Sequence, residues 1–310
     1  MVVVLAILAV VTTLALRSLD HIQDQKRDEA NRQSMQELRD AILGSPDDRA
    51  ADGSRTISGF VADMGRLPKA VEIDGNLTLA ELWMSPGQSF DVRPAIAANG
   101  VPVGLEDPQV LVSGGWRGPY LRLPIGASQW LDGWGNPMVT PLSLGSLNPE
   151  AEGYARLRDG SDNPLTEPDR EIEIIRHLGA NGTFGAADTG YDRDGGLALT
   201  SGSFGASLTA QVEVMDGDEP ADVDAGRTIT LCVFSPDPAD PSKIKVTSEG
   251  VTFGSNPVIL PALTGLTQGS RVIRAYEHPS MDPPNSSRKS TVKNLVLRPG
   301  ANFVELKIDR

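Results

Sequence analysis

Residues 1–16 read MVVVLAILAVVTTLAL, and residues 17–43 continue as RSLDHIQDQKRDEANRQSMQELRDAIL. Neither stretch contains Pro or Gly, and Gly44 and Pro46 follow directly. A Gly followed two residues later by Pro is a typical helix terminus. The sequence therefore predicts one helix over residues 1–43, about 65 Å long at about 1.5 Å per residue. Such a helix is too long for burial in one small domain and must extend into a membrane, a filament or both.

The uncharged first part of this helix has several interpretations. A secretory signal peptide requires basic residues before its apolar core, whereas the first charge here, Arg17, follows the core. A plain membrane anchor needs about 20 apolar residues, and residues 1–16 would rise only about 24 Å as a helix. A buried helix of a soluble domain fits poorly, because the rest of the chain is mostly β-like. A segment specialised for both membrane and filament explains the short run best.

The run MVVVLAILA resembles the N-terminal segment of type IV pilins and type II secretion pseudopilins. Members of that family carry a basic leader, a cleavage site and a glutamate ahead of this run, and many have a helix-kinking Pro; residues 1–43 contain no such features. The resemblance implies that Met1 lies inside the mature helix. It also implies a single-pass protein of the bacterial inner membrane with its globular part in the periplasm. Its helix would pack against other pilin or pseudopilin subunits.

The charged part of the helix divides into two sections. Residues 20–33 are polar on almost all sides, which is typical of a helix surrounded by water or bridging between elements. Met35, Leu38 and Ile42 then recur at spacings of three and four, so we expect this stripe to pack on a globular head. Two later segments are assigned from composition and spacing: a short helix within residues 60–67 and a loop over residues 85–108.

Two aromatic motifs follow, GWRGPYLRLP at residues 115–124 and DGWGNPM at residues 132–138. Their Gly-Pro and Asn-Pro pairs indicate turns, and their aromatic rings are expected to form the core of a small head. In this order, after such a helix, the two motifs closely resemble the head of the major pseudopilin of type II secretion systems. The resemblance implies an α+β head.

A Gly- and Asp-rich stretch closes the head. Residues 178–195 resemble the calcium loop of the major pseudopilin, although Asn181 stands where the family usually has Asp and the spacing of the last acids differs. Ca²⁺ takes six to eight oxygen ligands from carboxylates, amides and carbonyls. An ordinary acidic turn explains the composition equally well. The predicted calcium ligands are Asn181, Asp188, Asp192 and Asp194.

Residues 196–310 change in character to short β-branched or alternating runs separated by turn residues. Six or seven strands at this spacing predict an antiparallel, immunoglobulin-like β-sandwich. The expected strands lie at 208–215, 227–235, 243–248, 270–276, 291–297 and 302–308. The lone cysteine, Cys232, is expected to be buried and structural. Residues 277–290 are expected to form a long polar loop, exposed or bound to a partner.

Composition restricts the function. The formal net charge of −13 argues against nucleic-acid binding. Three widely spaced His give no zinc site, and no nucleophile, phosphate loop or paired acids at a meaningful spacing indicate an enzyme. Two hypotheses remain: a structural subunit of a type II secretion pseudopilus or type IV pilus-like filament, and a filament-borne adhesin or receptor whose sandwich engages a protein partner.

The expected fold class is therefore α+β. It comprises a transmembrane and filament helix (1–43), a pilin-like head (44–195) and an appended sandwich (196–310). The bulk of the sandwich favours a minor subunit over a major one.

Overall fold

The computed structural model describes residues 2–47, 49, 57–86, 92–95, 107–142, 155–180, 190, 195–222, 224, 226–240, 243–279 and 288–310. The part of the chain that the structure describes is mostly β, with 43% strand and 17% helix, and its sheets are mostly antiparallel. The α+β fold class is therefore wrong. Beyond the N-terminal helix, the described residues of the predicted head form only short helical segments, α2 (Phe60–Met64) and the 3₁₀ turn η1 (Ala80–Leu82).

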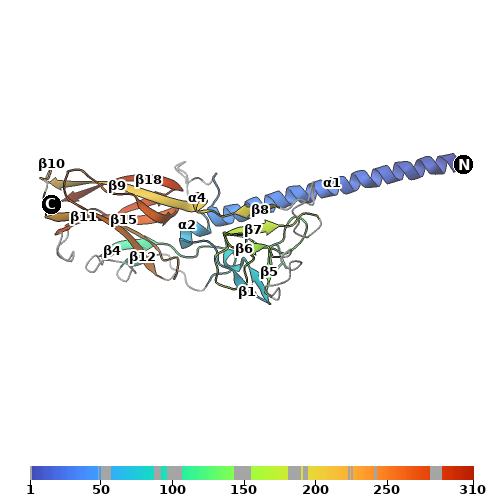
Figure 1. Ribbon diagram of the computed structural model, residues 1–310, viewed down its shortest axis with the longest axis horizontal. Helices are drawn as coiled ribbons and strands as arrows, with labels where there is room; N and C mark the ends of the chain where they lie inside the picture. The colour runs from blue at the N-terminus through green and yellow to red at the C-terminus, as the bar shows by residue number, and fades with distance from the viewer. Residues whose placement is uncertain are drawn as a thin grey trace. The chain divides into compact units, whose positions relative to one another are not determined.

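The N-terminal helix, α1, extends over Val2–Leu43 as one continuous element (Figure 1). It ends where the sequence predicted. Gly44 has a positive φ of 82°, and its backbone N–H donates to the Asp40 carbonyl at 2.8 Å. A Cβ on residue 44 would lie 2.2 Å from the Ser58 carbonyl oxygen. Only glycine fits this turn, because the position combines a left-handed conformation with close backbone contact.

The membrane assignment of this helix is corrected. Among the residues that the structure describes, no helix is both long enough and apolar enough to cross a membrane. The single-pass inner-membrane localisation is accordingly not supported. The physical reason is that the uncharged run ends at Arg17, and charged residues occupy the rest of α1.

The chain forms two compact units whose segments alternate along the sequence. The first unit comprises Met1–Arg39, Lys69–Ala80 and Arg122–Ala198, and the second comprises Asp40–Pro68, Glu81–Leu121 and Leu199–Arg310. The two aromatic motifs are thus separated: residues 115–121 belong to the second unit and residues 132–138 to the first.

The first unit contains part of α1 and two small antiparallel sheets. One sheet has the order β1-β2-β5 and the other β6-β7-β8. Their strands are β1 (Val71–Ile73), β2 (Asn76–Thr78), β5 (Thr140–Pro141), β6 (Leu157–Arg158), β7 (Ile174–His177) and β8 (Gly195–Ala198).

The second unit contains the sandwich, and all six expected strands are present. The longer ones are β9 (Gly205–Asp216), β11 (Arg227–Pro236), β12 (Ile244–Thr252), β15 (Gly269–Pro279), β17 (Lys293–Leu297) and β18 (Gly300–Asp309). The short elements are β10 (Glu219–Pro220), β13 (Val258–Ile259), β14 (Leu263–Thr267), β16 (Arg288–Lys289) and the helical turn α4 (Ser201–Phe204).

β9 is the centre of one sheet of the sandwich. β14, β13 and β10 pair with successive parts of β9 in antiparallel fashion. β18 pairs with it in parallel, from Gly300 opposite Ala206 to Asp309 opposite Met215. The expectation of a purely antiparallel sandwich is therefore corrected, because the last strand joins the first strand of the sandwich in the same direction.

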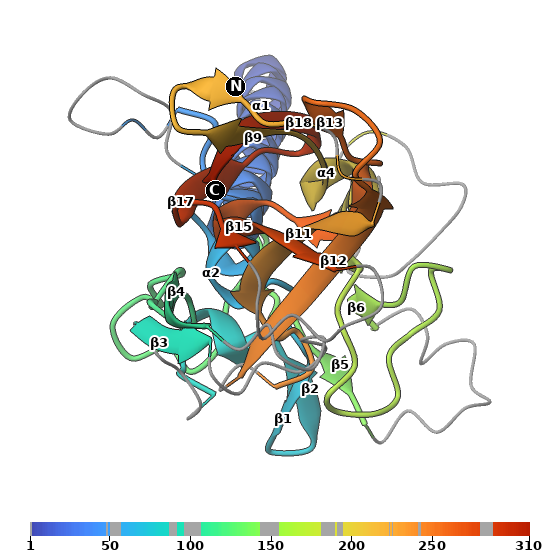
Figure 2. The ribbon, with the colours of Figure 1, turned by 90° about the vertical axis from the view of Figure 1, so that its left-hand side faces the viewer.

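The other sheet has the order β12-β11-β15, with β16 and β17 pairing along β15. In Figure 2, β9, β13 and β18 form the upper layer, and β11, β12 and β15 lie beneath them. Ser290 links the layers at one side, since it forms a bridge with Ile308 and its N–H donates to the Ala275 carbonyl at 2.9 Å.

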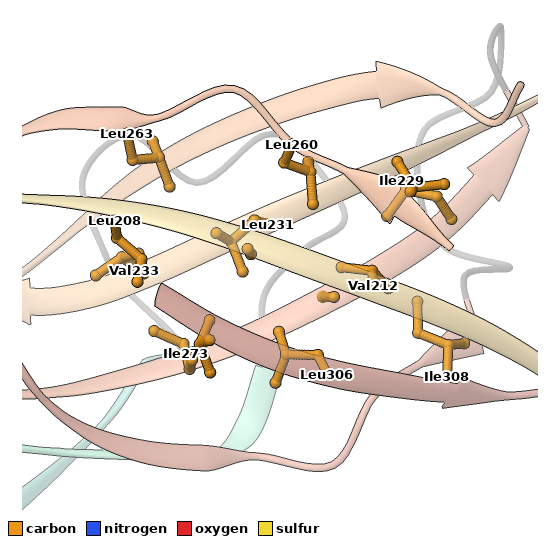
Figure 3. Close-up of a cluster of buried hydrophobic side chains, with 14 of the residues drawn as sticks. Leu208, Val212, Ile229, Leu231, Val233, Leu260, Leu263, Ile273, Leu306 and Ile308 are labelled. Carbon is orange, nitrogen blue, oxygen red and sulfur yellow. The ribbon is translucent and has the colours of Figure 1, made fainter. Parts of the chain in front are cut away.

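The core between the sheets follows the alternation of the strands (Figure 3). Leu208 and Val212 of β9 and Leu306 of β18 point inward, toward Leu231 of β11 and Ile273 of β15, and all five side chains are fully or almost fully buried.

A second buried cluster covers the opposite face of the β11–β15 sheet. Its cover is β4 (Asp107–Ser113), which pairs with β3 (Val92–Ala95). The expectation of a loop over residues 85–108 is therefore wrong at its described strand residues, because β3 lies within this range and β4 begins at its end. The cluster contains Val110, Val112, Cys232, Phe234, Ile244, Val246, Val272 and Tyr276. The prediction of a buried thiol at Cys232 is confirmed, and burial raises its pKa to about 12.

Candidate assembly surface on the long helix

The middle of α1 is open to solvent. Every side chain from residue 21 to residue 30 is exposed or half-buried, and Ile22 is 46% exposed. This exposure confirms the prediction of a solvated helical section for residues 21–30, whereas Asn31, within the predicted range of 20–33, is buried. A helix with charged residues on all sides gains little from packing and must be stabilised by its own side chains.

Side-chain pairs one turn apart supply that stabilisation. The Gln25 amide donates to Glu29 at 3.2 Å, and Arg32 pairs with Asp28 at 2.9 Å. Exposed pairs of this kind contribute about 0.2–0.5 kcal/mol each to an isolated helix. Several in succession keep the exposed section helical without any apolar face.

From Asn31 onward the helix is docked. Asn31 and Ser34 are 1% and 8% exposed, and Leu38 and Ile42 are completely buried. The predicted stripe is therefore confirmed for Leu38 and Ile42, while Met35 is half-buried. The two buried polar residues were missed, because the sequence gives no apolar signal at their positions.

In the first unit, the motif around Trp130 supplies the partners of these polar residues. The Trp130 indole N–H donates to the Ser34 hydroxyl at 2.8 Å, and that hydroxyl donates to the Leu131 carbonyl at 3.2 Å. Ser34 is thereby satisfied in both roles, which removes the cost of burying an unpaired hydroxyl.

Gly133 allows the backbone of this motif to touch α1. A Cβ at this position would lie 2.3 Å from the Arg27 carbonyl oxygen and 2.3 Å from the Asn31 nitrogen. Beside it, the Arg27 guanidinium lies over the Trp134 ring, 5.8 Å from its centroid. Any larger residue at position 133 would separate the motif from the helix.

The turn that presents Gly133 is built on Asp132. Its carboxylate accepts from the backbone N–H groups of Trp134 and Asn136 at 2.9 and 2.8 Å. The same carboxylate pairs with Arg156 at 2.7 Å, and both residues are almost fully buried. The motif residues thus hold the turn against the helix instead of forming the centre of a core, and Trp130 and Trp134 are only half-buried.

The same turn occurs a second time, at Asp159. The sequences DGWGNP (132–137) and DGSDNP (159–164) share the pattern D-G-x-x-N-P. The Asp159 carboxylate accepts from the N–H groups of Ser161 and Asn163 at 2.9 and 2.8 Å. These hydrogen bonds, chiefly that from Asn163, lower the pKa of Asp159. The repeat is visible in the sequence and could have been found there.

The earlier motif, residues 115–121, holds α2 in the second unit. The Tyr120 hydroxyl donates to the Asp63 carboxylate at 2.9 Å, and the Tyr120 ring meets Phe60 edge-on at 5.5 Å. Burial raises the pKa of Asp63, while the Tyr120 hydrogen bond acts in the opposite direction. The Trp116 indole donates to the Glu81 carbonyl at 2.7 Å, beside the buried Arg66–Glu81 pair.

The end of α1 is fixed by the turn between β14 and β15, also within the second unit. The Gln268 amide donates to the carbonyl of Leu43, the last helical residue, at 2.7 Å. Arg271, which is completely buried, donates to the Ala62 carbonyl in α2 at 3.0 Å. Burial lowers the pKa of Arg271 to about 10. The end of α1 and the sandwich are therefore parts of the same folded unit, joined by these buried hydrogen bonds.

The predicted calcium ligands Asn181, Asp188, Asp192 and Asp194 lie outside the residues that the structure describes. Within the described part, no group of three or more His, Cys, Asp or Glu side chains is arranged to hold a metal ion.

Comparison of the sequence with models of known protein families found no match, and comparison with curated proteins found no similar sequence.

Proposed function

We propose that this chain is a pilin-like subunit of an extended filament, of the type II secretion pseudopilus or type IV pilus kind, and that it contacts other subunits through α1. The observation that carries the proposal is the exposure of residues 21–30 in a helix of 42 residues. Among the described residues, the motif around Gly133 packs on the helix at Arg27 and Asn31.

The physical basis is the low stability of a helix that is exposed to water on all sides. Isolated helices are marginally stable in water, and most helical stability in proteins comes from tertiary packing. An exposed helical section of several turns gains the missing stabilisation when other chains pack against it. Other subunits of the same filament are the natural partners, because each copy presents the same surface.

Disulfide crosslinking of the full chain tests this proposal. Cys232 is completely buried, so an introduced cysteine is the reactive thiol. Gln25→Cys, on the exposed section of α1, should give disulfide-linked dimers and larger species under mild oxidation. Thr264→Cys, an exposed position of the sandwich, is the matched control and should stay largely monomeric. Monomers for both variants would contradict assembly through the helix.

The alternative function is a binding subunit whose sandwich engages a protein partner. It is favoured by two large apolar side chains exposed on the sandwich, Phe303 at 57% and Ile259 at 65%. Calcium binding by the loop at residues 181–194 stays a prediction, and a calcium-dependent rise in the melting temperature of the full chain would support it.

A further inference from the structure

Four charged residues meet at one end of the sandwich core. Glu277 of β15 lies opposite Ile229 of β11 and opposite Arg288 of β16. Arg227 begins β11, and Arg310 follows β18. Three of them, Arg227, Glu277 and Arg310, stand two positions from the core residues Ile229, Ala275 and Ile308 of their own strands, so the cluster lies at the end of the space between the two sheets.

The geometry pairs one carboxylate with three guanidinium groups. Glu277 is completely buried, and its Oε1 lies 2.8 Å from Arg227 Nε and 2.5 Å from an Arg310 nitrogen. Arg288 lies farther away, 3.9 Å from Oε2, and its side chain is 46% exposed. Residues 277–290 had been expected to form a polar loop; the burial of Glu277 and Ser290 corrects that expectation at its two ends, and residues 280–287 lie outside the described part of the chain.

The cluster has more positive charge than its own carboxylate can neutralise. Glu277 Oε1 accepts a hydrogen bond from Arg310, whereas among the described residues Oε2 accepts none and the buried Nε atoms of Arg227 and Arg310 have no hydrogen-bond partner. The Arg288 guanidinium likewise has no hydrogen-bond partner among the described residues. Asp216 follows Met215, whose carbonyl accepts from the Arg310 backbone N–H; it is exposed and forms no ion pair with Arg310 among the described residues.

The sides of the cluster are partly apolar. The Arg310 guanidinium lies 5.5 Å from the centroid of the Phe253 ring, and Phe253 is completely buried. Arg227 and Arg310 are only 20% and 16% exposed, so they hold their positive charges in a weakly hydrated place. A charge-assisted hydrogen bond is stronger in such surroundings. A guanidinium group can also donate two parallel hydrogen bonds to the two oxygens of one carboxylate.

We propose that this end of the sandwich binds a carboxylate side chain of an acidic peptide segment from a partner protein, with Arg288 as its first contact and Arg227 and Arg310 behind it. The ligand carboxylate supplies the second negative charge that the three arginines lack. This inference names a partner chemistry for the sandwich and does not depend on assembly through α1, so the crosslinking result leaves it intact.

Fluorescence anisotropy with a labelled hexaglutamate peptide and the full chain tests this site. We expect saturable binding that weakens as the salt concentration rises, and no binding of hexaglutamine. Arg288→Gln should weaken binding about tenfold, which equals about 1.4 kcal/mol, within the range for hydrogen bonds to charged groups. Arg298→Gln removes the same charge from an exposed position elsewhere in the sandwich and should leave the affinity unchanged.

Because Arg288 is half-exposed, its replacement should leave the fold intact, and a melting curve checks this. Glu277→Gln sharpens the test: if it folds, the loss of the internal carboxylate should tighten peptide binding. The proposal is overturned if the wild-type chain does not bind hexaglutamate, or if Arg288→Gln and Arg298→Gln bind it equally. Stabilisation by inorganic phosphate without any peptide binding would also overturn it, in favour of a small-anion site.

Discussion

The two sheets of the sandwich are built from strands of similar length, yet their outer faces differ. β9 alternates between buried and half-buried residues, and the outward Phe303 on neighbouring β18 is 57% exposed. β11 is buried at six consecutive positions from Ile229 to Phe234, because β4 lies on its outer side. An alternating strand has one covered face, whereas an unbroken buried run has two. The run ITLCVF thus indicated a covering element that the strand pattern alone did not locate.

Removal of the cover should have the largest effect. A fragment of residues 199–310 lacks β4 and would expose Phe234, Val246 and Tyr276 to water. We expect it to aggregate or to melt without a cooperative transition, measured by circular dichroism and light scattering. A fragment of residues 40–310 contains the whole second unit and is the control. Cooperative melting of the short fragment would show that the sandwich needs no cover.

Phe234→Ala tests one side chain under the cover. Phe234 is completely buried, and its loss leaves a cavity, so unfolding should become easier by about 3–5 kcal/mol. Urea denaturation of the full chain measures this change, with Phe234→Leu as a milder control. An effect below about 0.5 kcal/mol, the range of ordinary surface positions, would mean that β4 does not cover this face in solution.

Cys232→Ser introduces a hydroxyl into the same cluster at nearly constant volume. Burying a hydroxyl without a hydrogen bond costs about 1–3 kcal/mol in proteins, so the melting temperature should fall. Cys232→Ala separates the polarity effect from the loss of volume. A serine variant as stable as the wild type, with the alanine variant less stable, would indicate a polar partner at this position.

Phe303→Thr should have the smallest effect. Its side chain is 57% exposed on the uncovered sheet, and surface substitutions usually change stability by less than about 0.5 kcal/mol. Equal denaturation curves for the wild type and the variant would complete the contrast with Phe234. A loss near that of Phe234→Ala would show that the outer face of β9 and β18 is covered as well.

Local patterns predicted much of this fold. The end of α1 at Gly44, the buried Leu38 and Ile42, the strands of the sandwich and the buried Cys232 all followed from spacing and composition. The β3–β4 hairpin did not, because Pro94 and Pro108 give its sequence the composition of a loop. The parallel pairing of β9 and β18 was also missed, since alternation says which residues face inward but not which strands are neighbours.

The sites show the same limit. Trp130 and Gly133 belonged to a recognised motif, but their contacts with Ser34 and Asn31 join residues about a hundred positions apart in the chain. Glu277 was placed in a loop because polar residues follow it. The sequence feature that could have indicated a buried Glu277 is its position at the end of an apolar strand. A charged residue that faces inward there needs partners from other strands.

The parallel pairing of β9 and β18 has a mechanical consequence. The two strands are paired from Ala206 and Gly300 to Met215 and Asp309. A pulling force applied at the start of β9 and at the end of β18 would act along this ladder in shear. All its hydrogen bonds would then share the load at once, whereas a hairpin pulled at its open end breaks them one after another. A subunit that carries tension through its sandwich would therefore resist extension most strongly along this pair of strands.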